Sequence, residues 1–257
     1  MRFIKLAEDI VPKVWGREII FSNKEIEDVL NKKAPLLIKI IETNQDLSYQ
    51  VHPSKESYKE LGEVGTKNEA WYVLNSAPDS KIGLGVKIDD KKLLRECFEN
   101  GKVDEIVNYY NIWKNDFVYI ESGTLHMLGK NIEVLEVQQN NDITYRVYDY
   151  GRGREMHLDQ GMLSLNTRNN SKIKIGSNIN FENENFIMHK HNIKGKREID
   201  VSGHKYCYIV PLSGDGRIIV GDTECVLELK KCYYLEADAV TLIGRCEIMF
   251  VYEKESE

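Results

Sequence analysis

One stretch of the chain concentrates side chains that can bind a metal ion: DLSYQVHPSKESYKELGEVGTKNEAWYVL. Alternate side chains of an extended strand point to the same face, so Ser48, Gln50 and His52 are expected to project together. Glu69 opens a later strand-like run, and His126 follows a glycine turn in FVYIESGTLHML. Two imidazoles, a carboxylate and an amide oxygen suit zinc, and iron or manganese would accept the same mixture. The alternative for Ser48, Gln50 and His52 is that they lie on an ordinary solvent-exposed face of a sheet.

Strand-like runs dominate the chain and would have to position these side chains. They are rich in Val, Ile and Tyr, and short stretches with Gly, Asn, Asp and Ser separate them, which is typical of an antiparallel sandwich or barrel. Helical spacing of apolar residues occurs only in NKEIEDVLNK, SKESYKELG and DDKKLLRECFENGKVDEIVNYYN. We therefore expect a mainly β protein with a few short helices inserted on the scaffold.

A polar stretch, LNTRNNSKIKIGSNINFENENF, predicts a domain boundary. Residues 1–165 would form the metal-binding domain, with a small helical insert at about 89–111. Residues 166–257 would form a second, metal-free β-domain, because it has no histidine after His204 and His189 and His191 are interpreted as surface residues.

Composition narrows the classes of function. The 257 residues include 41 acidic and 35 basic ones, for a net charge of −6, which argues against nucleic acid as a partner. No apolar run approaches the roughly 18 residues of a membrane span, and MRFIKLAEDIVPKVWG lacks the features of a signal peptide. We expect a cytoplasmic protein. The five cysteines include no CxxC pair and are interpreted as buried reduced thiols rather than disulfides.

Four ordered motifs resemble a known family: LSYQVHP, KNEAWYVL, GTLHMLG and EVLEVQQNNDITYRVYDYGR. They are similar to the signature segments of the type I mannose-6-phosphate isomerases, zinc enzymes of the cupin superfamily, and most similar to the short bacterial branch. The likeness runs from KVWGREI to GREMHLDQGM, about the first 165 residues, and is weak beyond. It implies cupin-type antiparallel β-sandwich or jelly-roll barrels, a cupin-like second domain, and interconversion of mannose 6-phosphate and fructose 6-phosphate by a monomer or homodimer.

The resemblance also implies roles for individual residues. Carried over position by position, one zinc ion per chain would be bound by Gln50, His52, Glu69 and His126. The family's active-site arginine falls on Arg146. The other matching positions are Lys67 and Glu136 as catalytic residues, and Lys39, Ser48, Asp142 and Trp15 as substrate-binding residues.

The chemistry of an aldose-ketose isomerase explains the need for such groups. A proton must leave the carbon beside the carbonyl and return to its neighbour through an enediol, and a positioned base typically contributes ~10²- to 10⁴-fold. Glu136 is the candidate base, because the alternation of IEVLEVQQ places it with Gln138 on one face and Glu133 on the other. A surface ion pair is the alternative for Glu136. A neutral glutamine ligand would leave more positive charge on the metal.

Three cationic residues suit an anionic substrate. Lys39 interrupts the apolar run LLIKII, where it needs a partner such as a phosphate or Glu42. The planar fork of Arg146 suits a phosphate or an enediolate oxygen, and this residue is expected to share a face with Thr144 and Tyr148. A surface ion pair is the alternative for Arg146. Lys67 would donate to a sugar oxygen or merely flank the proposed carboxylate ligand.

Two rival functions remain open at this stage. An Fe(II) cupin oxygenase could use His52, Glu69 and His126 as its two histidines and one carboxylate. A non-catalytic sugar-phosphate-binding cupin could keep the metal without turnover. The short separation between Glu69 and His126 leaves no room for the helical domain of longer family members, so a smaller lid over the pocket is expected.

Overall fold

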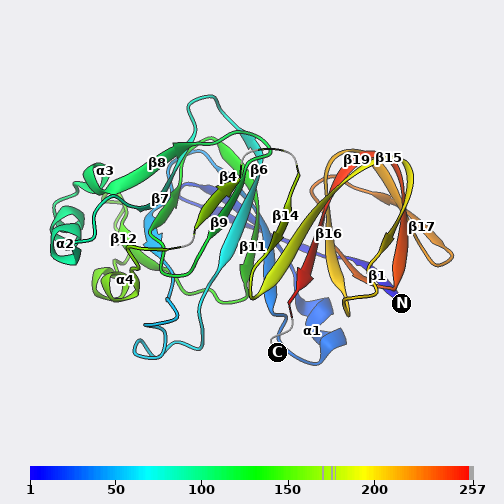
Figure 1. Ribbon diagram of the computed structural model, residues 1–257, viewed down its shortest axis with the longest axis horizontal. Coiled ribbons are helices and arrows are strands. Elements are labelled where there is room, and N and C mark those ends of the chain that lie inside the picture. The colour runs from blue at the N-terminus through cyan, green and yellow to red at the C-terminus, as the bar shows by residue number, and fades with distance from the viewer. Residues whose placement is uncertain (170, 175, 177, 255–257) are drawn as a thin grey trace. The chain divides into compact units, whose positions relative to one another are not determined.

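The computed structural model describes residues 1–169, 171–174, 176 and 178–254, and antiparallel strands dominate it (Figure 1). The chain forms two compact units. Unit 1 comprises Met1–Asp9, Ile20–Ile38 and Ser177–Glu257, and unit 2 comprises Ile10–Ile19 and Lys39–Gly176. Unit 1 therefore includes two N-terminal segments that sequence analysis placed in the first domain.

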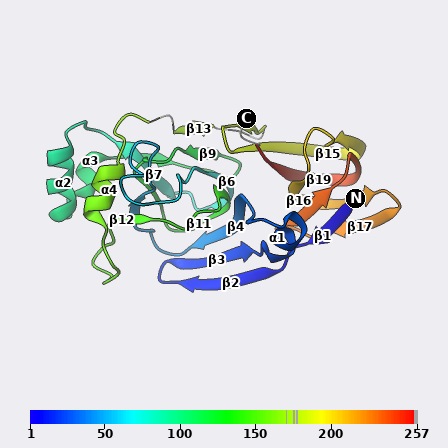
Figure 2. The same cartoon turned by 90° about the horizontal axis from the view of Figure 1, so that it is seen from below.

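Two antiparallel sheets carry the residues of interest. The five-stranded sheet has the order β12 (Tyr145–Tyr148), β5 (Tyr49–Val51), β10 (His126–Leu128), β7 (Lys81–Val86) and β8 (Val107–Asn111). The seven-stranded sheet has the order β13 (Lys172–Lys174), β9 (Phe117–Ile120), β6 (Glu69–Ser76), β11 (Ile132–Gln139), β4 (Leu36–Thr43), β3 (Gly16–Phe21) and β2 (Glu8–Lys13). Figure 2 shows β2 and β3 beside β4 at the edge of this sheet.

The two sheets pack face to face through one apolar cluster. Leu84 and Leu128 from the five-stranded sheet belong to the same buried cluster as Trp71, Val118 and Val134 from the seven-stranded sheet. Side chains of opposing sheets interdigitate in this way in a β-sandwich. The prediction of a mainly β, cupin-type antiparallel sandwich is confirmed.

Three helices cover the outer face of the five-stranded sheet: α2 (Lys91–Glu99), α3 (Val103–Ile106) and α4 (Leu158–Ser164) (Figure 1). Asp90 begins α2 by accepting hydrogen bonds from the backbone N–H groups of Lys92 and Leu93. Leu94 and Phe98 of α2 share a buried cluster with strand residues including Tyr49, Val51 and Met127. The insert expected at about 89–111 thus consists of α2, α3 and β8. The helices of this insert pack on the sheet's outer face.

Unit 1 is built on long strands. Its sheet has the order β1 (Arg2–Lys5), β18 (Tyr233–Glu236), β16 (Cys207–Val220), β19 (Ala239–Glu253), β15 (Phe186–Asp200) and β14 (Asn180–Glu182), with β17 (Thr223–Leu227) also paired to β16. Helix α1 (Lys24–Leu30) belongs to the same unit. Ile209, Leu242 and Phe250 are fully buried in its apolar cluster.

Glycines allow these long strands to bend. Gly244 of β19 lies between Gly195 of β15 and Gly216 of β16 in the strand register. The φ angle of Gly244 is 138°, and a Cβ atom there would lie 2.2 Å from the backbone oxygen of Asp215. Because a side chain does not fit, glycine permits the close approach of β16 and β19, and Figure 1 shows the strands curving.

Two predictions from composition can be compared with the structure. All five cysteines are unpaired, and only Cys225 is not fully buried. No helix within the described ranges combines the length and the apolar character needed to span a membrane.

Candidate metal centre and surrounding polar site

Strand alternation directs one set of polar side chains between the two sheets of unit 2. Tyr49, Val51 and Met127 belong to the cluster that faces the helices. Their neighbours Gln50 and His126 therefore face the seven-stranded sheet, and they lie directly opposite one another in the β5–β10 pair. This register brings the side chains of Gln50 and His126 together on the inward face.

The seven-stranded sheet contributes side chains from the other side. Trp71 and Val73 belong to the cluster between the sheets, so Glu69, two residues before Trp71, shares their inward face. Glu69 lies opposite Gln138 in the β6–β11 pair, and Trp71 lies opposite Glu136. The inward face of β6 and β11 is therefore polar at this end of the sandwich and apolar toward Val73.

His52, Glu69 and His126 form one buried group. Nε2 of His52 lies 3.1 Å from Oε2 of Glu69, and Nε2 of His126 lies 3.2 Å from Oε1 of the same carboxylate. Their possible ligand atoms all lie within 4.8 Å of one another. The three side chains come from opposing sheets, and each is at most 1% exposed.

Backbone contacts determine which nitrogen of each imidazole carries the proton. Nδ1 of His52 lies 2.9 Å from the carbonyl oxygen of Ile143, and Nδ1 of His126 lies 2.9 Å from that of Thr124. Nδ1–H must donate to each carbonyl, so a neutral ring presents the unprotonated Nε2 to Glu69. Burial and the nearby Lys67 charge lower the pKa of His52 to about 3, which keeps that ring neutral.

Glu69 is ionised in this arrangement. Burial opposes its charge, but the positive charge of Lys67 beside it outweighs burial and holds the pKa of Glu69 well below its ordinary value. Nζ of Lys67 lies 3.6 Å from Oε2 of Glu69. Lys67 itself is 5% exposed, so this ammonium is a buried charge that flanks the carboxylate.

The donor set fits a divalent cation. Two imidazole lone pairs converge on a carboxylate, and the buried atoms Glu69 Oε1 and His126 Nε2 have no hydrogen-bond partner within the described ranges. Acceptors that face acceptors are unfavourable unless a cation lies between them. Nitrogen and carboxylate oxygen are ligands that zinc takes, and the amide of the neighbouring Gln50 can add a neutral oxygen.

Glu136 lies in a second buried contact set. Its Oε2 accepts a hydrogen bond of 2.9 Å from Nε1 of Trp71, and its Oε1 lies 3.5 Å from Nζ of Lys39. Burial and the nearby Glu69 charge raise the pKa of Glu136. The surface ion pair considered for Glu136 is excluded, because the side chain is only 4% exposed.

Lys39 takes Glu136 rather than Glu42 as its partner. Arg17 binds Glu42 through two hydrogen bonds of 2.7 and 2.9 Å. Burial opposes the charge on Lys39, but Glu136 foremost, and Asp142 to a lesser extent, raise the pKa of this lysine. Asp142 is exposed on the loop before β12, and its electrostatic contribution places it in the surroundings of Lys39.

Ser48 and Trp15 are both buried, in different surroundings. Ser48 immediately precedes β5, whereas Trp15 lies in the apolar cluster between the sheets, together with Trp71 and Ile41. Trp15 therefore packs as a core residue, although the resemblance implies a substrate-binding role for it.

Arg146 lies opposite Gln50 in the β12–β5 pair and therefore on the inward face. Its Nη1 donates to the carbonyl oxygen of Glu155 at 2.8 Å, while its buried Nε has no partner within the described residues. A register shift after Arg146 breaks the alternation, and Tyr148 packs with Tyr49 on the helical side. The expected common face of Arg146 and Tyr148 is wrong because of this bulge.

Sequence reasoning underestimated three residues of the site. Trp71 was given no role, yet its indole Nε1 donates to Glu136. Asn68 accepts from the backbone N–H of Ser122 at 2.8 Å and so ties the start of β6 to the turn before His126. Gln138 was placed on the face of Glu136 but given no role. Only the alternation of KNEAWY and EVQQ could have indicated that Trp71 and Gln138 point inward.

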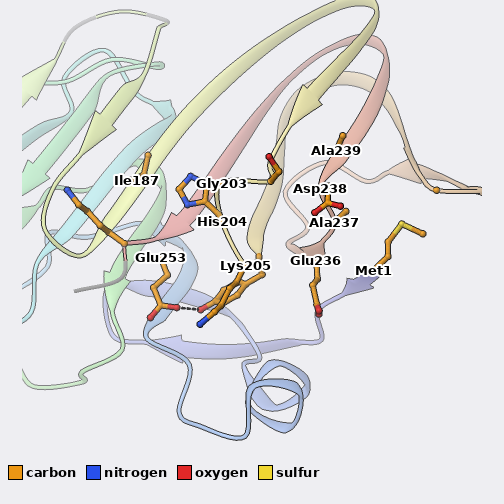
Figure 3. A pocket seen from close by; sticks show the side chains of 14 residues that line it. Met1, Ile187, Gly203, His204, Lys205, Glu236, Ala237, Asp238, Ala239 and Glu253 are labelled. Atoms are coloured by element: carbon orange, nitrogen blue, oxygen red, sulfur yellow. Dashed lines mark hydrogen bonds between the residues drawn. The ribbon is translucent and has the colours of Figure 1, made fainter. Parts of the chain in front are cut away.

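A cavity of about 950 Å³ in unit 1 has none of the predicted site residues in its lining (Figure 3). Two of its acidic groups have partners: Tyr206 donates to Glu253 at 2.7 Å, the hydrogen bond drawn in Figure 3, and Arg2 lies 3.7 Å from Glu236. Among the described residues, the lining holds no group of metal-ligating side chains comparable to the one around Glu69.

A two-sheet antiparallel sandwich with histidines and a glutamate gathered between its sheets defines a protein of the cupin class. Residues 7–84 match the family described as phosphomannose isomerase type I, catalytic domain. The chain is 33% identical over 237 residues to the probable mannose-6-phosphate isomerase GmuF of Bacillus subtilis, which covers 85% of this chain and 75% of that protein. The chain belongs to the type I mannose-6-phosphate isomerase family, a family of intramolecular oxidoreductases, and the resemblance seen in the sequence is confirmed.

Solved structures agree on the fold. The crystal structure of mannose 6-phosphate isomerase from Bacillus subtilis matches with a TM-score of 0.85 at 22% identity, covering 98% of this chain and 100% of that chain. A structure of mannose 6-phosphate isomerase bound with zinc and yttrium matches with a TM-score of 0.74 at 13% identity, covering 98% of this chain and 99% of that chain.

Proposed function

We propose that the chain interconverts mannose 6-phosphate and fructose 6-phosphate with a zinc ion held by Gln50, His52, Glu69 and His126. The observation that carries the proposal is the convergence of two imidazole nitrogens on the buried carboxylate of Glu69, at 3.1 and 3.2 Å. Membership of the isomerase family supports the reaction, and the zinc-bound relative supports the choice of metal.

When bound, zinc would supply positive charge that polarises or orients the oxygens of the sugar's reacting carbons. The residues around it would position the ion. Hydrogen bonds from the two Nδ1–H groups to backbone carbonyls orient both imidazoles, and Lys67 stabilises the ionised Glu69. Gln50 would add a ligand without adding negative charge.

Glu136 is the proposed base that moves the proton between the two carbons through an enediol. It is buried, and Trp71 and Lys39 hold its two oxygens separately. The indole orients the carboxylate, and the ammonium keeps a compensating charge beside it. An oriented carboxylate in a water-poor site is suited to accept a proton from carbon and return it.

Cationic and polar groups would hold the anionic sugar phosphate. Arg146 faces inward, its Nε has no partner among the described residues, and it is the proposed partner of a substrate oxygen. Lys67 would contact a sugar oxygen. The remaining proposed substrate-binding residues are Lys39, Ser48, Asp142 and Trp15, with Trp15 acting indirectly through the apolar cluster that it shares with Trp71.

A coupled assay for both directions of the reaction tests the proposal, with and without a chelator. Arg146→Ala should lower kcat/KM by roughly 10- to 100-fold, because a charged hydrogen bond contributes about 1.5–3 kcal/mol. Arg17→Ala is the matched control, since Arg17 forms an exposed ion pair with Glu42, and it should change kcat/KM by less than about twofold.

Metal analysis and light scattering complete the test. The proposal includes one zinc ion per chain, a monomer or homodimer, and a cytoplasmic location. A zinc-replete protein without turnover would favour the sugar-phosphate-binding alternative, whereas selective retention of iron with oxygen consumption would favour the oxygenase. Chelator-resistant isomerase activity would remove zinc from the proposal.

A further inference from the structure

Gln138 carries a buried acceptor oxygen that the described residues leave without a hydrogen-bond donor. The side chain is 0% exposed, and its Oε1 accepts no hydrogen bond from any residue that the structure describes. Gln138 lies directly opposite Glu69 in the β6–β11 pair, so the two Cβ atoms are about 5 Å apart on the inward face. Glu136, two residues earlier on the same strand, shares this face.

The orientation of the Gln138 amide follows from its donors. Nε2 donates to the backbone carbonyl oxygens of Gln139 and Asn141, at 3.1 and 3.2 Å. The reversed amide would place an oxygen against two carbonyl oxygens, which is unfavourable. Both amide hydrogens are thus in use, and the only group that Gln138 can offer to another molecule is an acceptor oxygen.

The next residue provides a contrast within the same strand. Gln139 is half-buried on the opposite face, and its Oε1 accepts from the backbone N–H of Asn68 at 2.8 Å and from Oγ1 of Thr66 at 3.2 Å. The two adjacent glutamines therefore differ in whether their side-chain oxygen has a hydrogen-bond donor. The protein satisfies the acceptor of Gln139, while the acceptor of Gln138 is left for a donor that is not part of the described chain.

We propose that Gln138 is a further binding residue of the isomerase site, whose Oε1 accepts a hydrogen bond from an O–H group held beside Glu69. This inference rests on the proposed function. The donor chemistry is the same for a sugar hydroxyl and for a water molecule on the metal. The amide oxygen of Gln138 is neutral and lies on the same face as Glu69, so it suits a neutral hydroxyl as the donor.

The experiment compares Gln138→Met with Gln139→Met. Methionine keeps the length of the side chain but removes the acceptor oxygen and the two donors. KM and kcat are measured in both directions, zinc affinity is measured by competition with a chromogenic chelator, and binding of the inert polyol mannitol 6-phosphate is measured by calorimetry. Gln138→Asn, which withdraws the amide by one methylene group, serves as a second variant if Gln138→Met does not fold.

If a sugar hydroxyl is the donor, Gln138→Met should raise KM and the Kd of mannitol 6-phosphate about tenfold, and zinc affinity should not change. If a water molecule on the metal is the donor, Gln138→Met should instead bind zinc about tenfold more weakly. Gln139→Met should lower thermal stability while leaving these constants within about twofold. Unchanged constants in Gln138→Met, or equal changes in both variants, would overturn the proposal. Absence of isomerase activity in the zinc-replete wild type would instead reject the underlying function.

Discussion

The two units fill their interiors in different ways. Unit 1 buries an apolar cluster that includes Ile209, Leu242 and Phe250, and its buried Lys190 lies 2.9 Å from Glu247. Unit 2 buries a comparable apolar cluster between its sheets but gathers His52, Glu69 and other polar groups at one end.

The difference lies in whether polar groups without a partner converge. Unit 1 also has buried atoms, such as Nε2 of His191 and the hydroxyl oxygen of Tyr208, that find no hydrogen-bond partner among the described residues, but its described part holds no group of metal-ligating side chains. In unit 2, Oε1 of Glu69, Nε2 of His126 and Oε1 of Gln138 have no hydrogen-bond partner within the described chain. A buried polar group without a partner is costly in folding, so its partner is expected to arrive with a metal or substrate.

The largest expected effect concerns the proposed metal ligands. His126→Ala removes one of the two imidazoles, so we expect loss of bound zinc and a decrease in kcat/KM of about 10³-fold or more. Metal analysis of the purified variant and the isomerase assay measure both. His189→Ala, a half-buried histidine of unit 1, is the control and should retain zinc and activity. Full zinc occupancy in His126→Ala would contradict the assignment.

The next effect separates proton transfer from metal binding. Glu136→Gln should lower kcat by ~10²- to 10⁴-fold while zinc content is unchanged, because the base is lost but the ligands remain. Glu133→Gln, on the opposite face of β11, is the matched control and should keep kcat within about twofold. Steady-state kinetics and metal analysis on the same samples decide the outcome. A kcat near the wild-type value in Glu136→Gln would assign the base elsewhere.

A substitution in unit 1 should affect stability rather than chemistry. Leu242→Ala creates a cavity in the apolar cluster and should lower the free energy of unfolding by about 2–5 kcal/mol. Denaturant unfolding measures this change, and kcat of the folded variant should equal that of the wild type. Val226→Ala, at an exposed position of β17, should change the free energy of unfolding by less than about 0.5 kcal/mol. A large loss of kcat in folded Leu242→Ala would remove the contrast between the units.

The smallest expected effect is a pH dependence in unit 1. Burial, Arg197 and His189 lower the pKa of His191 from 6.5 to about 4. Between about pH 4 and pH 6.5, His191 is therefore protonated in the unfolded chain but not in the folded one. The contribution of His191 therefore decreases stability as pH falls from about 6.5 to about 4 and is absent above that window.

His191→Gln should flatten this part of the profile. The measurement is the denaturant midpoint of both proteins at several pH values between 4 and 7. Parallel profiles of the two proteins would show that His191 does not titrate differently on folding. His189 and His191 are half-buried, and their rings pack against those of Tyr252 and Phe250.

Local alternation accounts for much of what the sequence predicted. A strand places residues two positions apart on one face, so the inward directions of Glu136 and Gln138 could be inferred from IEVLEVQQ. The same rule failed at Arg146 and Tyr148, because a bulge is a property of the paired strands and leaves no clear mark in one of them. The partner of Lys39 was also missed, since Arg17 occupies the nearby Glu42.

Sequence alone was enough to predict the strand-rich class, the family and the types of the proposed metal ligands, because composition, short-range periodicity and ordered motifs are local properties. Only the tertiary structure decided that His52 and His126 from one sheet meet Glu69 from the other, and that Trp71 and Lys39 hold Glu136. It also placed the insert helices on the outer face of the five-stranded sheet. These contacts depend on strand register and on which faces pack together, and both are set by burial across the whole sandwich rather than by any single segment.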